Sequence, residues 1–140
     1  MVSVFFYGSY INAGVLEQSG IHLDNCEVAT LAGYELIIAP RANLRPAAEH
    51  IAWGILTRVS HGDLERLYRD HAHRVLGQVY QPFPVIAQLR HGDIRPALCY
   101  ISLDMRPGPV DPDYVARIAT PAAQLGFPKS YVDRIWAFAT

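Results

Sequence analysis

The sequence predicts an α+β fold, because segments with strand patterns and segments with helix patterns follow one another in mixed order without a βαβ repeat. Hydrophobic residues make up 51% and charged residues 18% of the 140 positions, which is a globular composition. This length suits one domain with one modest core. We therefore expect a single domain over residues 1–140.

Five segments have the β-branched and aromatic content that indicates strands. They cover residues 2–7, 28–39, 50–59, 79–88 and 96–103. Residues 40–46, with the sequence PRANLRP, indicate a loop. Pro82 and Pro84 suit an edge strand or a bulge better than a central strand.

The helix signals fall in four further segments. Residues 11–19 predict a short helical turn that ends at Gly20, and Ser60 suits the N-cap of a helix from residue 61 to about residue 71. Asp111 and Pro112 suit the start of a third helix, which ends at Gly126. A last short helix covers residues 129–136.

Charge and cysteine content exclude several classes of protein. The net charge is −1 and no cluster of Lys and Arg exists, so the positive surface of a nucleic-acid-binding protein is missing. Cys26 and Cys99 lie far apart and have no metal-ligand spacing. The apolar run at the start is too short to span a bilayer and lacks a basic segment before it. We expect a cytoplasmic protein with no membrane and no nucleic-acid partner.

Four segments, taken in order, resemble the gamma-glutamylcyclotransferase-like family. They are residues 4–9 (VFFYGS); residues 31–36 with 41–46 and 52–56 behind them; residues 63–67 leading to Tyr80; and residues 113–114 through 125–131. Each segment alone is weak, but together they cover most of the chain in the family's order. The resemblance implies a small mixed β-barrel of about five to six strands with flanking helices and a cavity at one end.

The resemblance also implies a reaction. The typical member cyclises a gamma-glutamyl amine or dipeptide to 5-oxoproline and expels the leaving amine. The substrate's own α-amine attacks the γ-carbonyl, so neither a protein nucleophile nor a cofactor is needed. A base must take the ammonium proton and return one to the leaving nitrogen. Hydrogen-bond donors must stabilise the developing oxyanion.

A substrate loop is expected at residues 7–11, with the sequence Tyr7-Gly8-Ser9-Tyr10-Ile11. Gly8 permits a positive φ and a close approach of the backbone, and a strand that turns into a helix start aims N–H groups at an anion. By the resemblance, this loop holds the carboxylate or carbonyl of the substrate. The family usually has Asn after the Ser, whereas Tyr10 stands here and changes the volume and polar contacts of the pocket. Asn43, Tyr80 and Tyr114 match positions that line or support the family's pocket.

The family's catalytic glutamate, usually followed by glycine, has no counterpart, because this chain contains no Glu-Gly pair. Counting from Leu64 and Leu67 places that position on His71, with Asp70 one residue earlier. His71 could act as the base, because its unperturbed pKa of about 6.5 is close to neutral pH. To act as the base in place of the glutamate, the Asp70 carboxyl would need a raised pKa. A helix-end histidine without a catalytic duty fits His71 equally well. The His71-Ala72-His73 pair lacks a third ligand, so no metal is expected.

Three functions remain open from the sequence. The first, which we favour, is a cyclotransferase-like enzyme acting on a small gamma-glutamyl or related amide with His71 or Asp70 as the base. The second is a binding protein that keeps the pocket without the chemistry. The third is an enzyme with a different reaction, such as rearrangement, elimination or hydrolysis of another small metabolite. The partner is a small molecule in each case, and the chain could also form a homodimer through exposed aromatic residues.

Overall fold

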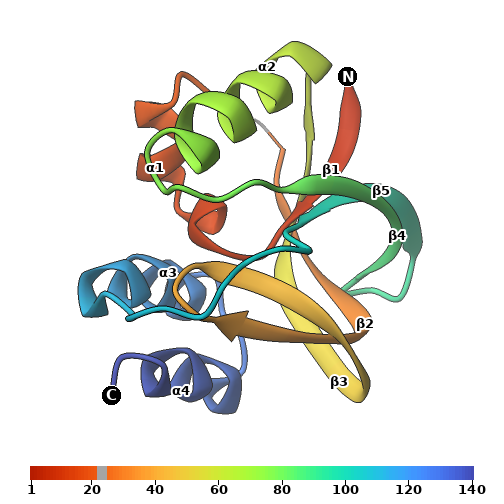
Figure 1. Ribbon diagram of the computed structural model, residues 1–140. Helices are drawn as coiled ribbons and strands as arrows, with labels where there is room; N and C mark the ends of the chain where they lie inside the picture. Colours follow the sequence, from red (N-terminus) through yellow and green to blue (C-terminus); the bar gives the residue numbers. More distant parts are fainter. Residues whose placement is uncertain (22–24) are drawn as a thin grey trace.

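The computed structural model describes residues 1–21 and 25–140, and five of its strands close into a barrel (Figure 1). The strands are β1 (Val2–Phe6), β2 (Glu27–Ile38), β3 (Ala42–Val59), β4 (Gln81–Leu89) and β5 (Ile94–Ile101). The helical elements are η1 (Ser9–Ile11), α1 (Ala13–Gln18), α2 (His61–Arg66), η2 (Leu67–His73), α3 (Pro112–Gln124) and α4 (Lys129–Ala137). This confirms the predicted α+β class and the small mixed barrel.

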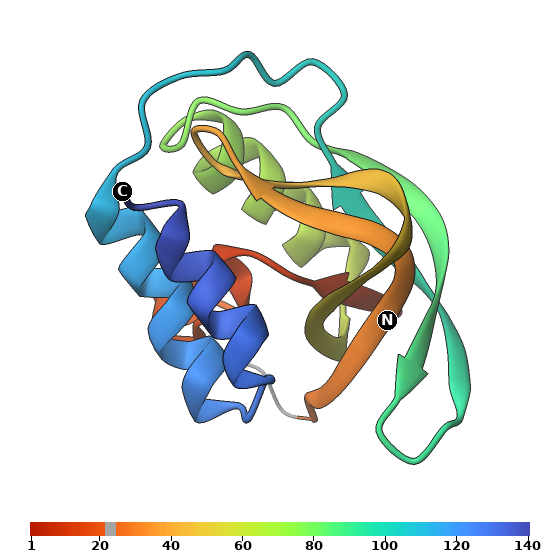
Figure 2. The ribbon, with the colours of Figure 1, turned by 90° about the horizontal axis from the view of Figure 1, so that it is seen from below.

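The strands follow one another around the barrel in the order β1-β3-β2-β4-β5. Strand β1 runs antiparallel to β3 and parallel to β5, and the other described pairings are antiparallel. The β2–β3 hairpin crosses the lower half of Figure 1, and the β4–β5 hairpin projects away from α3 and α4 in Figure 2. The loop after β1, which contains η1, contacts α3 and is joined to η2 by a side-chain hydrogen bond.

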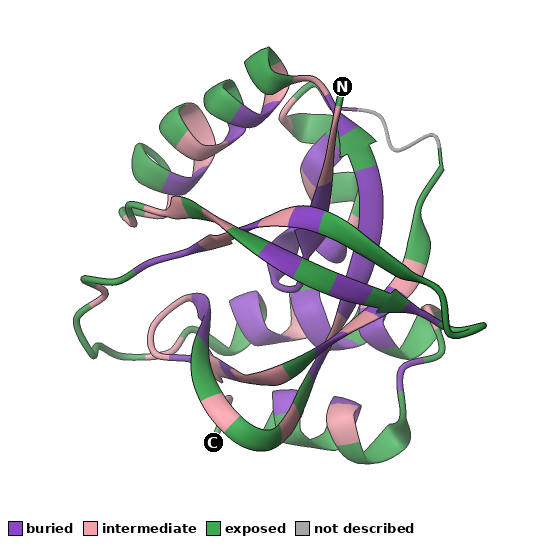
Figure 3. Ribbon diagram, turned by 90° about the vertical axis from the view of Figure 1, so that its right-hand side faces the viewer, coloured by how far each residue is buried: buried purple, intermediate pink, exposed green. Residues whose placement is uncertain are grey.

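The core fills the barrel and extends to both faces of β1, which is covered by helices outside the barrel. Val4, Phe5 and Phe6 of β1 are at most 1% exposed. Strand β4 alternates buried and exposed residues, seen as purple and green bands in Figure 3. Helices α3 and α4 lie side by side, and α3 buries Tyr114 and Ile118 (Figures 1 and 2). The apolar face of α3 therefore covers the end of the barrel that the β1 loop reaches.

The residues predicted from the sequence to begin or follow helices α2 and α3 do so in the structure. The side chain of Ser60 accepts a backbone N–H at 3.1 Å at the start of α2, and that of Asp111 accepts one at 2.9 Å at the start of α3. Gly126 follows α3 with a φ of 82°. The N–H of Phe127 then bonds the carbonyl of Ala122 at 3.1 Å, which closes the last turn in the usual left-handed arrangement.

The expectation of a loop over residues 40–46 is correct for Pro40 and Arg41 and wrong from Ala42 onward, because β3 begins at Ala42 and includes Pro46. Pro46 lies opposite Tyr34, where the pairing of β2 with β3 shifts register. A proline is tolerated at such an irregularity, since the regular ladder of hydrogen bonds is already interrupted there. Pro82 and Pro84 lie in the part of β4 that pairs with β5 alone, as an edge position requires.

The predicted α-helix from residue 61 to about 71 is correct only for its first part. Helix α2 ends at Arg66 and continues as the π-helix η2. In this wider turn, N–H groups bond carbonyls five residues back, as from Leu76 to His71 at 3.0 Å. A π-turn changes which residues share a face, so Ala72 is buried and His71 half-buried. The α-helical periodicity of 3.6 residues, on which the prediction is based, does not predict this change of face.

Gly54 in β3 leaves no space for a side chain. A Cβ there would overlap the carbonyl oxygen of Phe6 and lie 2.7 Å from the ring of Phe5. We expect Gly54→Ala to lower the free energy of unfolding by about 3 kcal/mol, because the pairing of β1 with β3 must move to relieve the overlap. A urea titration followed by circular dichroism measures this.

Gly62→Ala is the matched control, because nothing lies within 4 Å of its Cβ position in α2. This change should leave the free energy of unfolding unchanged or raise it slightly. Equal losses at the two glycine positions would contradict the packing of β1 against β3.

Candidate active site

Six of the eight tyrosines gather where the β1 loop, η2 and α3 meet: Tyr7, Tyr10, Tyr68, Tyr80, Tyr100 and Tyr114. Five of them line a small cavity together with neighbouring residues. The lining consists of Phe6, Tyr7, Gly8, Ser9, Tyr10, Ala42, Tyr68, Leu76, Tyr80 and Tyr114. Its volume is about 20 Å³, measured as the space open to the centre of a water molecule. Such a space holds about one water molecule.

The loop after β1 forms one wall of this cavity. Four of the five residues expected there, from Tyr7 to Tyr10, line the cavity. Ile11 is buried and faces a separate surface hollow between α1 and α3. Tyr7 donates its hydroxyl to the carbonyl of Tyr100 at 2.6 Å, which fixes the loop to β5.

Gly8 is required for space and not for its backbone angle. Its φ is −112°, so the expected positive φ is wrong. The expected close approach is present, because a Cβ on Gly8 would lie 2.6 Å from the Cβ of Ala42. The start of β3 therefore packs directly against the loop.

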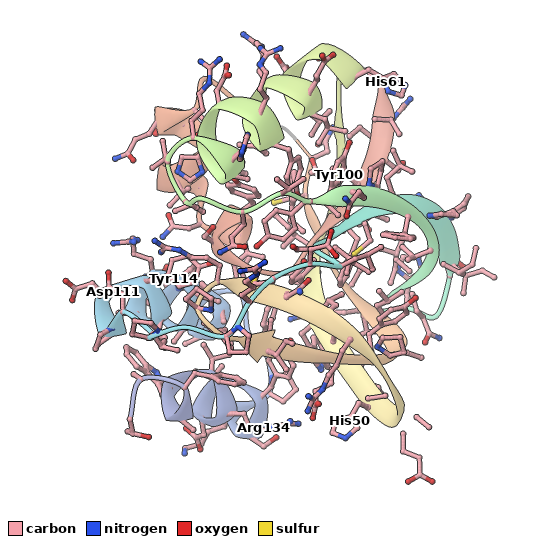
Figure 4. The ribbon with its side chains drawn as sticks, viewed as in Figure 1. His50, His61, Tyr100, Asp111, Tyr114 and Arg134 are labelled. Atoms are coloured by element: carbon pink, nitrogen blue, oxygen red, sulfur yellow. The ribbon has the colours of Figure 1, made fainter. Side chains whose placement is uncertain are left out.

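The backbone of Ala42 is held between two tyrosine hydroxyls. Its N–H donates to the Tyr114 hydroxyl at 2.9 Å, and its carbonyl accepts from the Tyr80 hydroxyl at 2.6 Å. Figure 4 shows Tyr114 on the side of α3 that faces the barrel. Asn43 lies behind this peptide and does not line the cavity. Its side chain exchanges two hydrogen bonds with the backbone of Ser102, at 2.7 and 3.0 Å, and so supports the start of β3.

The hydroxyl of Tyr10 meets the imidazole of His71. The Tyr10 oxygen lies 2.9 Å from Nδ1 of His71, although the residues come from η1 and η2. The Tyr10 ring packs edge-on against Phe6 and Tyr68, with centroids 5.7 and 5.5 Å away. The two positions at which the resemblance predicts a departure from the family's pattern are therefore in direct contact with each other.

The protonation states of this pair are set by their surroundings. Burial, followed by the charges of Arg117 and Arg41, lowers the pKa of His71 below 6.5, so the imidazole is neutral at neutral pH. Burial raises the pKa of Tyr10 well above its usual value, so its hydroxyl keeps its proton. A neutral pair forms this bond in one of two ways: the Tyr10 hydroxyl donates to Nδ1 when the ring proton of His71 lies on Nε2, or Nδ1–H donates to the Tyr10 oxygen in the other tautomer. In the first arrangement, the unprotonated Nδ1 can accept a proton from the Tyr10 oxygen.

Asp70 lies away from the cavity. Its side chain is 45% exposed and pairs with Arg69 at 2.9 Å and with Arg74 at 3.6 Å. The hydrogen bond from Arg69 lowers the pKa of the Asp70 carboxyl below its usual value. The fold thus brings His71, and not Asp70, to the tyrosine cluster.

Sequence reasoning missed the part that Tyr68 has in this site. Its ring stacks on Tyr100 with centroids 3.8 Å apart and planes 9° from parallel. Tyr68 and Tyr80 line both the cavity and an open surface groove of about 460 Å³. These two rings therefore separate the cavity from the groove. The spacing of Tyr68 four residues after Leu64 was the available signal, because it places both on one helix face.

Among residues 1–21 and 25–140, no three His, Cys, Asp or Glu side chains are placed to hold a metal ion. No helix in these same ranges is long and apolar enough to cross a membrane.

No family model matches the sequence, and no curated protein matches it either. Solved structures do match the fold. An uncharacterized human protein superposes with a TM-score of 0.79 at 18% identity, covering 97% of this chain and 86% of its own. A gamma-glutamyl cyclotransferase gives 0.77 at 18% identity with the same coverage. The yeast gamma-glutamyl cyclotransferase specific to glutathione gives 0.67 at 13% identity, covering 99% and 95%. The chain therefore has the gamma-glutamyl cyclotransferase-like fold that its sequence resembles.

Asn12 connects the loop after β1 to α3. Its Oδ1 caps α1 by accepting N–H groups at 3.0 and 3.4 Å. Its Nδ2 donates to the carbonyl of Arg117 at 3.0 Å. That carbonyl has lost its usual partner within α3, because Pro121, four residues later, has no N–H. The side chain of Asn12 therefore satisfies the carbonyl that the proline leaves free.

We expect Asn12→Asp to lower the free energy of unfolding by about 1–2 kcal/mol, because it keeps the cap but removes the donor to Arg117. Chemical denaturation measures the loss. In a Pro121→Ala background the helix can satisfy the carbonyl itself, so Asn12→Asp should cost less there. An equal cost in both backgrounds would contradict this role of Asn12.

Proposed function

We propose that this protein is a gamma-glutamylcyclotransferase-like enzyme in which Tyr10 and His71 together supply the acid–base chemistry of the missing glutamate. The observation that carries the proposal is the 2.9 Å hydrogen bond between the Tyr10 hydroxyl and His71 Nδ1. Tyr10 lines the same cavity as Tyr7, Gly8 and Ser9, which form the expected substrate loop. The substrate is a small gamma-glutamyl or related amide.

The pair can move protons in both directions that the reaction needs. The Tyr10 oxygen takes a proton from the substrate's α-ammonium while its own proton passes to the neutral Nδ1 of His71. The freed amine forms its bond to the γ-carbonyl carbon, and the amide C–N bond breaks. After ring closure the attacking nitrogen loses a second proton. Both protons pass through Tyr10 to the leaving nitrogen, which departs as an ammonium ion. A base with a pKa near neutral suits this two-way transfer.

A substrate can enter only if side chains at the cavity move, because the present space holds about one water molecule. Tyr68 and Tyr80 form the partition between the cavity and the 460 Å³ groove. Tyr80 is tied to the carbonyl of Ala42 by a hydrogen bond. Tyr68 has no such bond to the described residues, so opening at Tyr68 toward the groove is part of this proposal.

A binding protein without turnover is the second candidate. It is favoured by the cavity lining itself, in which the described residues include no carboxylate. This candidate predicts that a small acid or amide raises the melting temperature without being consumed, and that His71→Ala leaves binding largely intact.

The place of action and the assembly also remain predictions. Cys26 is exposed, Cys99 is buried, and both are free thiols. Free thiols are usual in a reducing compartment, which supports the expected cytoplasmic location. The homodimer stays a prediction from the sequence.

Release of 5-oxoproline from a panel of gamma-glutamyl amines and dipeptides tests the proposed reaction. We expect Tyr10→Phe and His71→Asn each to lower kcat/KM by about 100-fold or more, because both interrupt the proton path. Asp70→Asn is the matched control on the same helical turn and should change kcat/KM little. Absence of turnover across the whole panel would rule out the gamma-glutamyl substrate class.

The pH dependence of kcat/KM tests the role of His71 separately. Because burial and the nearby arginines hold the pKa of His71 below 6.5, the acid limb should have its midpoint below pH 6.5 and reach a plateau near neutral pH. His71→Asn should remove this limb. A limb that persists in the variant would assign the titration to another group.

The same lowered pKa has a consequence for stability. Because the folded protein favours neutral His71, its contribution to stability is complete above pH 6.5 and is lost as pH falls through the lower pKa of the folded state. Chemical denaturation at several pH values should show this loss in the wild type and a smaller one in His71→Asn.

A further inference from the structure

Two guanidinium groups lie against the ring of Tyr114. The Cζ of Arg41 is 4.7 Å from the ring centroid, and that of Arg117 is 5.9 Å from it. Arg41 lies just before β3, whereas Arg117 belongs to α3. Neither arginine lines the cavity, although Tyr114 does. The two positive charges therefore stand beside the cavity, over one of its walls.

No acidic side chain of residues 1–21 and 25–140 forms an ion pair with either arginine. Several other arginines of these residues do form ion pairs: Arg45, Arg66, Arg69, Arg74 and Arg134. Burial raises the pKa of Tyr114 and lowers that of His71, and Arg41 and Arg117 are the charged residues whose fields act on both groups, in the direction that lowers the pKa of each. Two like charges at one site repel each other and attract an anion.

We propose that Arg41 and Arg117 form a carboxylate-binding site beside the cavity, so that the ligand of this protein carries a carboxylate outside the part that enters the cavity. The planar guanidinium group binds carboxylates through two parallel hydrogen bonds. The Tyr114 ring supports both groups, and its own hydroxyl is fixed by the N–H of Ala42. The site is distinct from the backbone of the substrate loop. It selects acidic amides over neutral ones of the same size.

Binding of matched acids and amides tests this site without requiring turnover. The probes are two pairs that differ only in charge: 5-oxoproline with its carboxamide, and glutarate with glutaramide. In calorimetry and thermal-shift measurements, at least one acid should bind the wild type more tightly than its amide does. Added salt should lower the affinity of the protein for this acid. Arg41→Gln and Arg117→Gln should each lower the affinity for that acid about tenfold, or about 1.4 kcal/mol of binding free energy.

Lysine replacements at the same two positions should keep part of the affinity, because they keep the charge and lose the planar fork. Arg95→Gln is the matched control, since Arg95 is an exposed arginine on β5 in the hairpin that projects away from α3 (Figure 2). It should bind the acids as the wild type does. Acids that bind equally well to the Arg41 and Arg117 variants, or that bind no better than their amides, would overturn the proposal.

Measurements of binding and of turnover test the carboxylate site and the proposed reaction separately. Acid binding that depends on the two arginines, without turnover of any gamma-glutamyl compound, would support the carboxylate site and contradict the proposed reaction. Turnover that is unaffected by Arg41→Gln and Arg117→Gln would support the reaction and contradict the carboxylate site.

Discussion

The site depends on how the first peptide of β3 is held. The N–H and carbonyl of Ala42 are both bonded by tyrosine hydroxyls, from Tyr114 on α3 and from Tyr80 before β4. On its other side, the Cβ of Ala42 packs so closely on Gly8 that only glycine fits there. Three segments far apart in the sequence therefore meet at one residue. Their contacts fix where the loop after β1 lies, and this loop carries Tyr10.

The resemblance predicts departures from the family at Tyr10 and at His71, and the fold brings these two residues into contact. Tyr10 adds volume where the resemblance predicts an asparagine, and His71 takes the position at which it predicts a glutamate. The Tyr10 hydroxyl lies 2.9 Å from the imidazole. Tyr10 thus connects the cavity, which it lines, to His71, which does not line it. The same bulk helps to explain why the cavity is small, because Tyr10 and Tyr68 pack edge-on across it.

Much of the fold could be predicted from the sequence, because the local signal is strong where a single residue determines the boundary of a helix. Ser60 and Asp111 each begin a helix, and Gly126 follows the end of one, through contacts within a few residues. The barrel was predicted from the order of the motifs along the chain. The π-turn of η2, which buries Ala72, could not be predicted, since the local sequence contains no signal that separates it from a continued α-helix. The start of β3 was missed because proline and polar residues resemble a loop. The arginine pair over Tyr114 joins positions 41 and 117, and no local pattern connects them.

The most direct measurement restores the resembled family's residues at both positions. Rates of 5-oxoproline release are compared for the wild type, Tyr10→Asn, His71→Glu and the double variant. If Tyr10 and His71 act as a unit, each single change leaves a mismatched pair. The double variant should then lose less activity than the two single losses multiplied together. Single losses that simply multiply in the double variant would show that the two residues act independently, and would contradict the account.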